Sequence, residues 1–140
     1  MATSYVIDSS VIVKWISAEN EILLEEADLL LDQSRRLSLT LLTSELAKYE
    51  VGNAILRKTF LLPQKIACLE NLATLPIEYV PLSTEDAIQS LEIAQHYAIT
   101  YYDAVFIRLA MRSSCPLITD NPKHQQKVNK VKVIPLASYR

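Results

Sequence analysis

The chain alternates short apolar runs with longer stretches whose apolar residues recur every three or four positions. Apolar runs rich in β-branched residues predict buried strands at 5–7, 39–42, 77–80, 116–119 and 131–134. Helical spacing predicts helices at 11–16, 19–31, 45–57, 63–72, 87–97, 102–111 and 122–128. Alternating strands and helices of these lengths predict an α/β domain with a mainly parallel central sheet covered on both faces.

Helix-start signals support this division of the chain. The polar triplet at 8–10 follows the first strand directly, and Ser83 with two acids after it opens the helix at 87–97. Thr43 or Ser44 is the expected cap of the helix at 45–57, and Pro63 suits the first turn of the helix that it begins. With 140 residues, we expect residues 1–140 to form a single domain.

The composition excludes several classes of enzyme. Gly52 is the only glycine, whereas phosphate-cradling loops and the Gly-x-Ser-x-Gly nucleophile turn each need more than one. P-loop ATPases and GTPases, and dehydrogenases with the glycine-rich dinucleotide motif, are therefore excluded. A structural zinc site is not expected, because no cysteine or histidine has a partner at zinc-ligand spacing; these residues are Cys68, Cys115, His96 and His124.

Charge and hydropathy set the expected location and hint at a partner. No apolar run is long enough to span a membrane and no export signal is visible, so we expect a cytoplasmic protein with no membrane partner and with reduced cysteines. The net charge is −2, yet the charge is uneven. Six acids and no bases lie in 19–32, whereas after Asp120 the charged residues are all basic. Such a basic tail can bind phosphates, although it is more often a solvated face.

Two acids directly follow predicted strands. Asp8 comes after Tyr5-Val6-Ile7, and Asp120 comes after Leu117-Ile118-Thr119. The carboxyl ends of parallel strands meet at one edge of the sheet, where ligand sites form. Each acid has an alternative role as the cap of the helix that follows.

Two further acids stand among apolar residues on predicted helices. Glu50 shares a helix face with Asn53 and lies four residues from both Leu46 and Ala54, a setting in which a carboxylate needs a partner. Asp103 follows two tyrosines at a helix start, where the helix dipole is its alternative explanation. Carboxylates gathered without cysteine or histidine favour Mg²⁺ or Mn²⁺, and such a metal can activate water against a phosphodiester.

The ordered set of motifs resembles the PIN-domain nucleases, most closely the VapC-type toxins of toxin–antitoxin pairs. The residues that carry the resemblance are Val6-Ile7-Asp8-Ser9-Ser10, Tyr49-Glu50-Val51-Gly52-Asn53-Ala54, Tyr102-Asp103-Ala104 and Leu117-Ile118-Thr119-Asp120.

The resemblance implies a three-layer α/β/α PIN-like fold and endoribonuclease activity that depends on Mg²⁺ or Mn²⁺. It also implies an RNA substrate, a cognate antitoxin protein and a homodimer. Asp8, Glu50 and Asp103 would be the catalytic, metal-binding acids, with Asp120 as the fourth. Polar support would come from Ser10, Asn53, Thr119 and Asn121.

One position departs from the family pattern of threonine, one residue, then acid. Here that acid position holds Asn121 and the acid stands one residue earlier, at Asp120. Either Asp120 reaches the metal from a shifted loop, or the fourth carboxylate is lost. The second case favours an alternative function, a PIN-like interaction module that binds protein or RNA. A Mg²⁺-dependent phosphotransfer domain is a weaker rival, because Ser9-Ser10 replaces the acids expected after the first strand.

Overall fold

A computed structural model describes residues 3–36 and 39–140. Five strands form one parallel sheet in the order β3-β2-β1-β4-β5. The strands are β1 (Thr3–Ile7), β2 (Leu39–Ser44), β3 (Ile77–Val80), β4 (Leu117–Thr119) and β5 (Val133–Pro135). The predicted α/β class and parallel sheet are confirmed, and each strand expected from the sequence is present.

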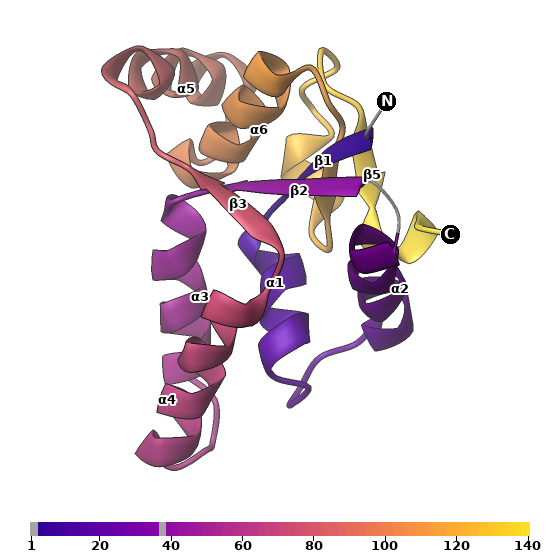
Figure 1. Ribbon diagram of the computed structural model, residues 1–140. Helices are drawn as coiled ribbons and strands as arrows, with labels where there is room; N and C mark the ends of the chain where they lie inside the picture. The colour runs from indigo at the N-terminus through magenta and orange to yellow at the C-terminus, as the bar shows by residue number, and fades with distance from the viewer. Residues whose placement is uncertain (1–2, 37–38) are drawn as a thin grey trace.

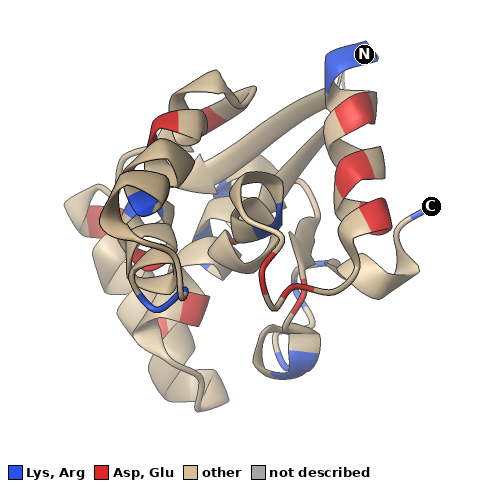
Figure 2. Cartoon of the chain, turned by 90° about the horizontal axis from the view of Figure 1, so that it is seen from below, with Lys and Arg blue, Asp and Glu red and all other residues tan. Residues whose placement is uncertain are grey.

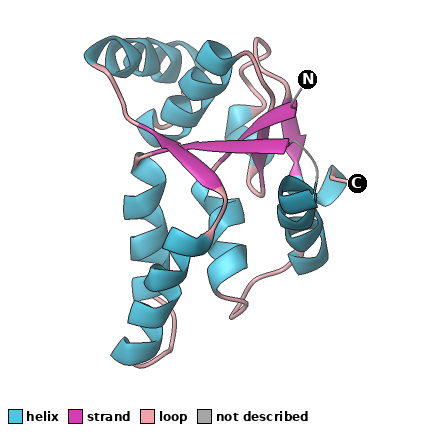
Figure 3. Cartoon of the chain, viewed as in Figure 1, coloured by secondary structure: helices cyan, strands magenta, loops and turns pink. Residues whose placement is uncertain are grey.

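Helices cover both faces of this sheet, as Figures 1 and 3 show. One face carries α1 (Ser9–Ile16), α2 (Leu24–Arg36), α3 (Leu46–Leu56) and α4 (Leu62–Glu70), and the other carries α5 (Thr84–Tyr97) and α6 (Tyr101–Ser113). The short helix α7 (Pro122–Gln125) contacts α6 and β5. Two short 3₁₀ turns, at Asn71–Thr74 and Leu136–Ser138, complete the described elements. The three-layer α/β/α architecture expected from the sequence is therefore confirmed.

The core explains why the strands are nearly continuous apolar runs. Ile7, Leu117 and Ile118 are fully buried because helices pack on both sides of the central strands. Helical residues that pack against the sheet, Ile12 of α1, Val51 of α3 and Ile107 of α6, are also fully buried and belong to the same core cluster. Backbone amides at the helix starts are bonded by capping side chains. Ser83, the predicted cap, accepts from the amide of Asp86, and Thr100, which the sequence pattern had not singled out, accepts from that of Asp103.

The predicted helix over 19–31 is wrong at its beginning, because α2 starts only at Leu24 and runs to Arg36. Asn20 and Leu23 adopt left-handed backbone angles, with φ of 56° and 57°, which no right-handed helix accommodates. The Lys14 ammonium donates to the Glu21 carboxylate and to the Ile22 carbonyl oxygen, and these two bonds hold the segment as a loop. Within α2, acidic residues recur along the helix and two arginines close its C-terminal end (Figure 2).

Smaller differences arise where tertiary contacts compete with local signals. Thr43 is not a helix cap but a buried residue of β2, where its hydroxyl donates to the Ile7 carbonyl oxygen at 2.7 Å. Ser44 accepts from the amide of Leu46 at 3.1 Å and so assists the start of α3. In the part of the chain that the structure describes, no helix has both the length and the apolar character needed to cross a membrane.

Replacing Gly52 by alanine is expected to stabilise the fold by about 0.5–1 kcal/mol, the usual difference between the two residues inside a helix. Gly52 lies within α3, its φ is not positive, and a Cβ built there meets nothing within 4 Å. Urea unfolding of Gly52→Ala measures the gain. Ala54→Gly in the same helix is the control of opposite sign and should lower the free energy of unfolding by at least this amount, because the Ala54 methyl group also packs against the core. An unchanged or lowered stability for Gly52→Ala contradicts the expectation.

Candidate metal centre at the sheet switch point

The site is positioned by the reversal of strand order between β1 and β4. From β1 the chain proceeds outward to β2 and β3 on one side, whereas β4 and β5 lie on the other. The two loops that leave β1 and β4 therefore diverge, and a crevice opens at their carboxyl ends. Asp8 and Asp120 follow these two strands, so the structure places both at the switch point, as the sequence predicted.

Three hydrogen bonds from two residues hold the Asp8 carboxylate after the carboxyl end of β1. Its carboxylate accepts the Ser10 amide at 3.1 Å and the hydroxyls of Ser10 and Thr119. It thereby caps α1, the alternative role considered for it, and is only 7% exposed. Burial raises the pKa of Asp8 to about 6, with a smaller contribution from the negative charge of Glu50, although the hydrogen bonds lower it. A desolvated carboxylate of this kind favours a cationic partner.

Glu50 and Asp103 complete the group of acids from two helices. Glu50, half-buried on α3, accepts the Ser9 hydroxyl at 3.0 Å. Burial raises the pKa of Glu50, and the nearby Asp103 raises it further, against the effect of the Ser9 hydrogen bond. Asp103 stands in the first turn of α6, where the helix dipole also stabilises its charge. The three acids thus form two electrostatically coupled pairs, Asp8–Glu50 and Glu50–Asp103.

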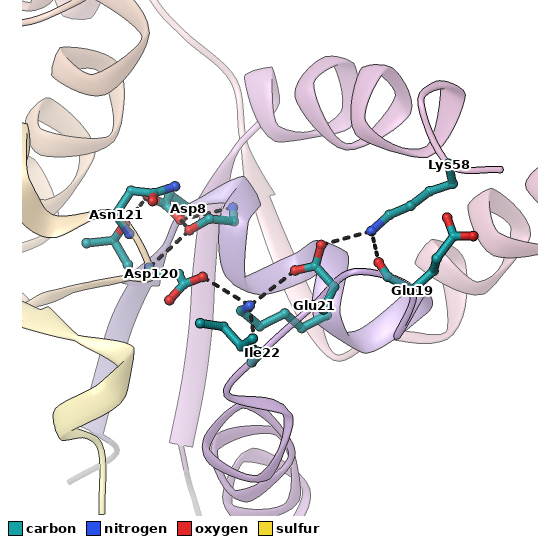
Figure 4. Close-up of polar contacts among 10 residues, drawn as sticks. Asp8, Glu19, Glu21, Ile22, Lys58, Asp120 and Asn121 are labelled. Atoms are coloured by element: carbon teal, nitrogen blue, oxygen red, sulfur yellow. Dashed lines mark hydrogen bonds and ion pairs between the residues drawn. The ribbon is translucent and has the colours of Figure 1, made fainter.

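Asp120 is engaged elsewhere. Its carboxylate pairs with the Lys14 ammonium at 3.0 Å, and Glu21 pairs with the same ammonium at 3.1 Å. Figure 4 shows the carboxylates of Asp120 and Glu21 meeting at that nitrogen, with Lys58 on the far side of Glu21. Only the backbone of Asp120 joins the acid group, because its amide donates to the Ser10 hydroxyl at 3.1 Å. The side chain of Asp120 is therefore already neutralised.

The polar residues expected to support the site divide into two groups. Ser10 and Thr119 bond Asp8 directly, and the Thr119 hydroxyl also accepts the amide of Asn121 at 3.0 Å. Asn53 is exposed on α3 and takes no part in these bonds. Asn121 lies at the rim of a groove that it shares with Asp103.

Sequence reasoning missed two residues of this region, Ser9 and Lys14. Ser9 follows Asp8 so closely that its bond to Glu50, 41 positions later, leaves no local signal. Lys14 did offer one, because it stands in Val-Ile-Val-Lys-Trp-Ile, a helix that is otherwise apolar. A lysine in such a helix is buried only with partners, which here come from the loop that follows α1 and from the distant loop that follows β4.

The donor chemistry of the acid group fits a hard divalent cation. Carboxylate oxygens are the ligands that Mg²⁺ and Mn²⁺ prefer, and Asp8 and Glu50 carry raised pKa values that a cation would reverse. Among residues 3–36 and 39–140, no lysine or arginine forms an ion pair with Asp8, Glu50 or Asp103. Over the same residues, no three acid, histidine or cysteine side chains already converge as a preformed metal cluster.

These features define a doubly wound α/β domain with an acid group at its switch point. The PIN domain family profile matches residues 5–130, so the chain belongs to the PIN domain family. No curated protein matches the chain by sequence.

Solved structures share this fold across nearly their whole length. The chain is similar to the toxin–antitoxin complex from Klebsiella pneumoniae, with 18% identity, a TM-score of 0.69, and coverage of 94% of this chain and 97% of that one. It is also similar to DNA-bound VapBC from Salmonella typhimurium, with 14% identity, a TM-score of 0.70, and coverage of 96% and 98%. A third is VapC20 of Mycobacterium tuberculosis, described as a sarcin-ricin loop cleaving toxin, with 10% identity, a TM-score of 0.67, and coverage of 89% and 95%.

Proposed function

We propose that this protein is a metal-dependent endoribonuclease that hydrolyses RNA phosphodiesters at Asp8, Glu50 and Asp103. The observation that carries the proposal is the coupling of these acids at the switch point. Burial raises the pKa values of Asp8 and Glu50, and in each case the charge of a neighbouring carboxylate raises the pKa further. Such an arrangement is unfavourable without a cation and is typical of functional sites rather than of a stabilising network.

Asp8, Glu50 and Asp103 would hold Mg²⁺ or Mn²⁺, which when bound supplies Lewis-acid polarisation of the scissile phosphodiester. The remaining tasks fall to the residues around them. Ser10 and Thr119 fix the orientation of the Asp8 carboxylate, as the hydrogen-bond partners of metal ligands do. Ser9 donates to Oε1 of Glu50 and fixes the orientation of that carboxylate in the same way.

The direct test is a titration of the purified chain with Mg²⁺ and Mn²⁺ in the presence of end-labelled single-stranded and structured RNAs. We expect products that appear only with the metal. EDTA should stop the reaction and excess Mn²⁺ should restore it. An absence of cleavage for every RNA, together with no metal binding by calorimetry, would leave the interaction module as the better function. The observation in favour of that alternative is Asn121, which stands where the family carries its fourth acid.

We further propose that the fourth carboxylate is lost, because Lys14 already pairs with Asp120. Asp120→Asn is then expected to leave the Mg²⁺ affinity within about twofold. Asn121→Asp should raise that affinity about tenfold, because a further carboxylate increases the ligand charge of the site beside Asp103. Isothermal titration calorimetry measures both changes. A large loss of Mg²⁺ affinity in Asp120→Asn would instead make Asp120 the fourth ligand.

The protein is proposed to act as the cytoplasmic toxin of a toxin–antitoxin pair and to form a homodimer. The support for an antitoxin comes from the similar solved structures, which are described as toxin–antitoxin or VapBC complexes. Expression in a bacterial host should arrest growth, and the Asp8→Asn variant should not. Light scattering of the isolated chain tests the dimer, and normal growth on expression of the active enzyme would argue against the toxin role.

A further inference from the structure

A groove of about 750 Å³ lies beside the acid group and is not accounted for by the metal site. Its lining includes the acids Asp103 and Asp120 together with Lys123, His124 and Gln126 from α7 and the residue that follows it. Asn121 also lines the groove and, in addition, a second cavity of about 300 Å³, which reaches Ser10 on α1. The two cavities share Asp120 and Asn121, so they lie next to each other at the carboxyl edge of the sheet.

The charge of the groove is more favourable to a polyanion than the presence of two acidic residues in its lining suggests. Asp120 is neutralised by Lys14 at 3.0 Å, which leaves Asp103 as the acid of the groove that no basic side chain pairs with in the described chain. Lys123 and His124 are both exposed, and Lys123 makes no ion pair in the same part of the chain. The segment after Asp120 contains no acid, so nothing within it offsets these groups.

An RNA strand that approaches three carboxylates needs positive charge nearby, since each phosphate carries a negative charge. The groove supplies that charge next to Asp103, one of the acids of the proposed reaction. Its volume falls within the range of small-molecule sites and accommodates a nucleotide. His124 adds a ring on which an unpaired base can stack, a contact that tolerates any base.

We propose that the groove between Asp103 and α7 binds single-stranded RNA next to the cleaved phosphodiester, with Lys123 and His124 as positioning residues for a flanking nucleotide. The inference rests on the proposed function, because it takes RNA as the substrate. It adds the place where the strand lies and the residues that hold it. Binding of the strand here does not require a metal, which makes the inference separable from cleavage.

The test is the binding of a fluorescein-labelled, unstructured RNA of about 12 nucleotides, a length that covers one single-strand site. Anisotropy is measured in EDTA, where no metal-dependent cleavage can occur. Lys123→Ala/His124→Ala is expected to weaken binding about tenfold. The slope of log K against log salt should become shallower by about 0.7–1, the change for one lost phosphate contact.

Lys132→Ala is the matched control. Lys132 is also an exposed lysine of the basic tail, but it lines a different cavity together with Cys115 and Pro116, which precede β4. Its loss should leave the affinity within about twofold. Equal weakening by both variants would overturn the proposal and indicate diffuse attraction to the whole tail. Unchanged binding in the double variant would overturn it as well.

Cleavage measured with Mn²⁺ on the same RNA separates the two proposals. If the double variant loses RNA binding and the wild-type protein does not cleave, the RNA-binding groove is supported and the nuclease proposal is wrong. Normal cleavage by the wild-type protein, with unaltered binding and KM in the double variant, would sink the groove and leave the nuclease standing. In the expected case, KM rises about tenfold while the fold is retained, because the variant removes only contacts to the bound strand.

Discussion

Asp8→Asn is expected to lower metal-dependent RNA cleavage at least about a hundredfold, the usual loss when a charge-stabilising group of an active site is removed. The free energy of unfolding without metal should stay unchanged or rise by up to about 2 kcal/mol. Burial raises the pKa of Asp8 from 3.8 to about 6, which corresponds to on the order of 3 kcal/mol of unfavourable charge at neutral pH. Asparagine removes that charge and still caps a helix.

Part of this gain is offset by the two hydroxyls that bond Asp8. Ser10 and Thr119 each donate to the carboxylate, and each also accepts a backbone amide. An asparagine offers one carbonyl oxygen in place of two carboxylate oxygens, so one hydroxyl loses its acceptor at a cost of about 1–2 kcal/mol. Urea unfolding in EDTA measures the net effect. Asp28→Asn, on the exposed side of α2, is the control for loss of one negative charge.

The pH dependence has a definite sign. Because the pKa of Asp8 is raised in the folded state, the folded protein binds more protons than the unfolded chain between about pH 4 and 6. The contribution of Asp8 to stability is therefore fully present below this window and is lost as the pH rises through 6. The stability difference between wild type and Asp8→Asn should widen over this range in favour of the variant. A fall of more than about 1 kcal/mol for Asp8→Asn at neutral pH would contradict this expectation and would mean that the hydrogen bonds of the Asp8 carboxylate outweigh the cost of burying its charge.

Lys14→Met is expected to destabilise the protein by about 3 kcal/mol, because loss of one partner leaves buried charges uncompensated. The Lys14 side chain is 1% exposed and bonds Asp120, Glu21 and the Ile22 carbonyl oxygen. The expected effect lies toward the lower end of the usual 3–5 kcal/mol for two reasons. The Asp120 side chain is 21% exposed and so remains partly solvated, and Glu21 still pairs with Lys58 at 2.9 Å.

Chemical denaturation tests this expectation against two further variants. Arg36→Met removes an exposed pair with Asp32 and should change stability by less than about 1 kcal/mol. Lys14→Met/Asp120→Asn should recover part of the loss, because the unpaired carboxylate is also removed. A change below about 1 kcal/mol for Lys14→Met would mean that water replaces the ammonium and that the ion pairs do not hold these loops.

The sequence determined the order and type of nearly all elements. Strands such as 117–119 are short, apolar and bounded by polar residues, and parallel sheets bury such strands on both faces. The helix starts at Ser83 and Thr100 depend on caps within three residues of the bonded amide, so they are local features. The acids Asp8, Glu50 and Asp103 were also recognisable, since carboxylates next to apolar runs are unusual without a partner.

Only the tertiary structure decided which charges meet. The loop at 19–23 looked helical because the acids and apolar residues there have helical spacing, yet Lys14 bonds Glu21 and Ile22 and holds the backbone outside the helix. In the same way, Asp120 follows a strand just as Asp8 does, but its carboxylate pairs with Lys14 across 106 positions of chain. Local patterns carry no information on such contacts, because ion pairs depend on distance in space and on the burial that folding creates.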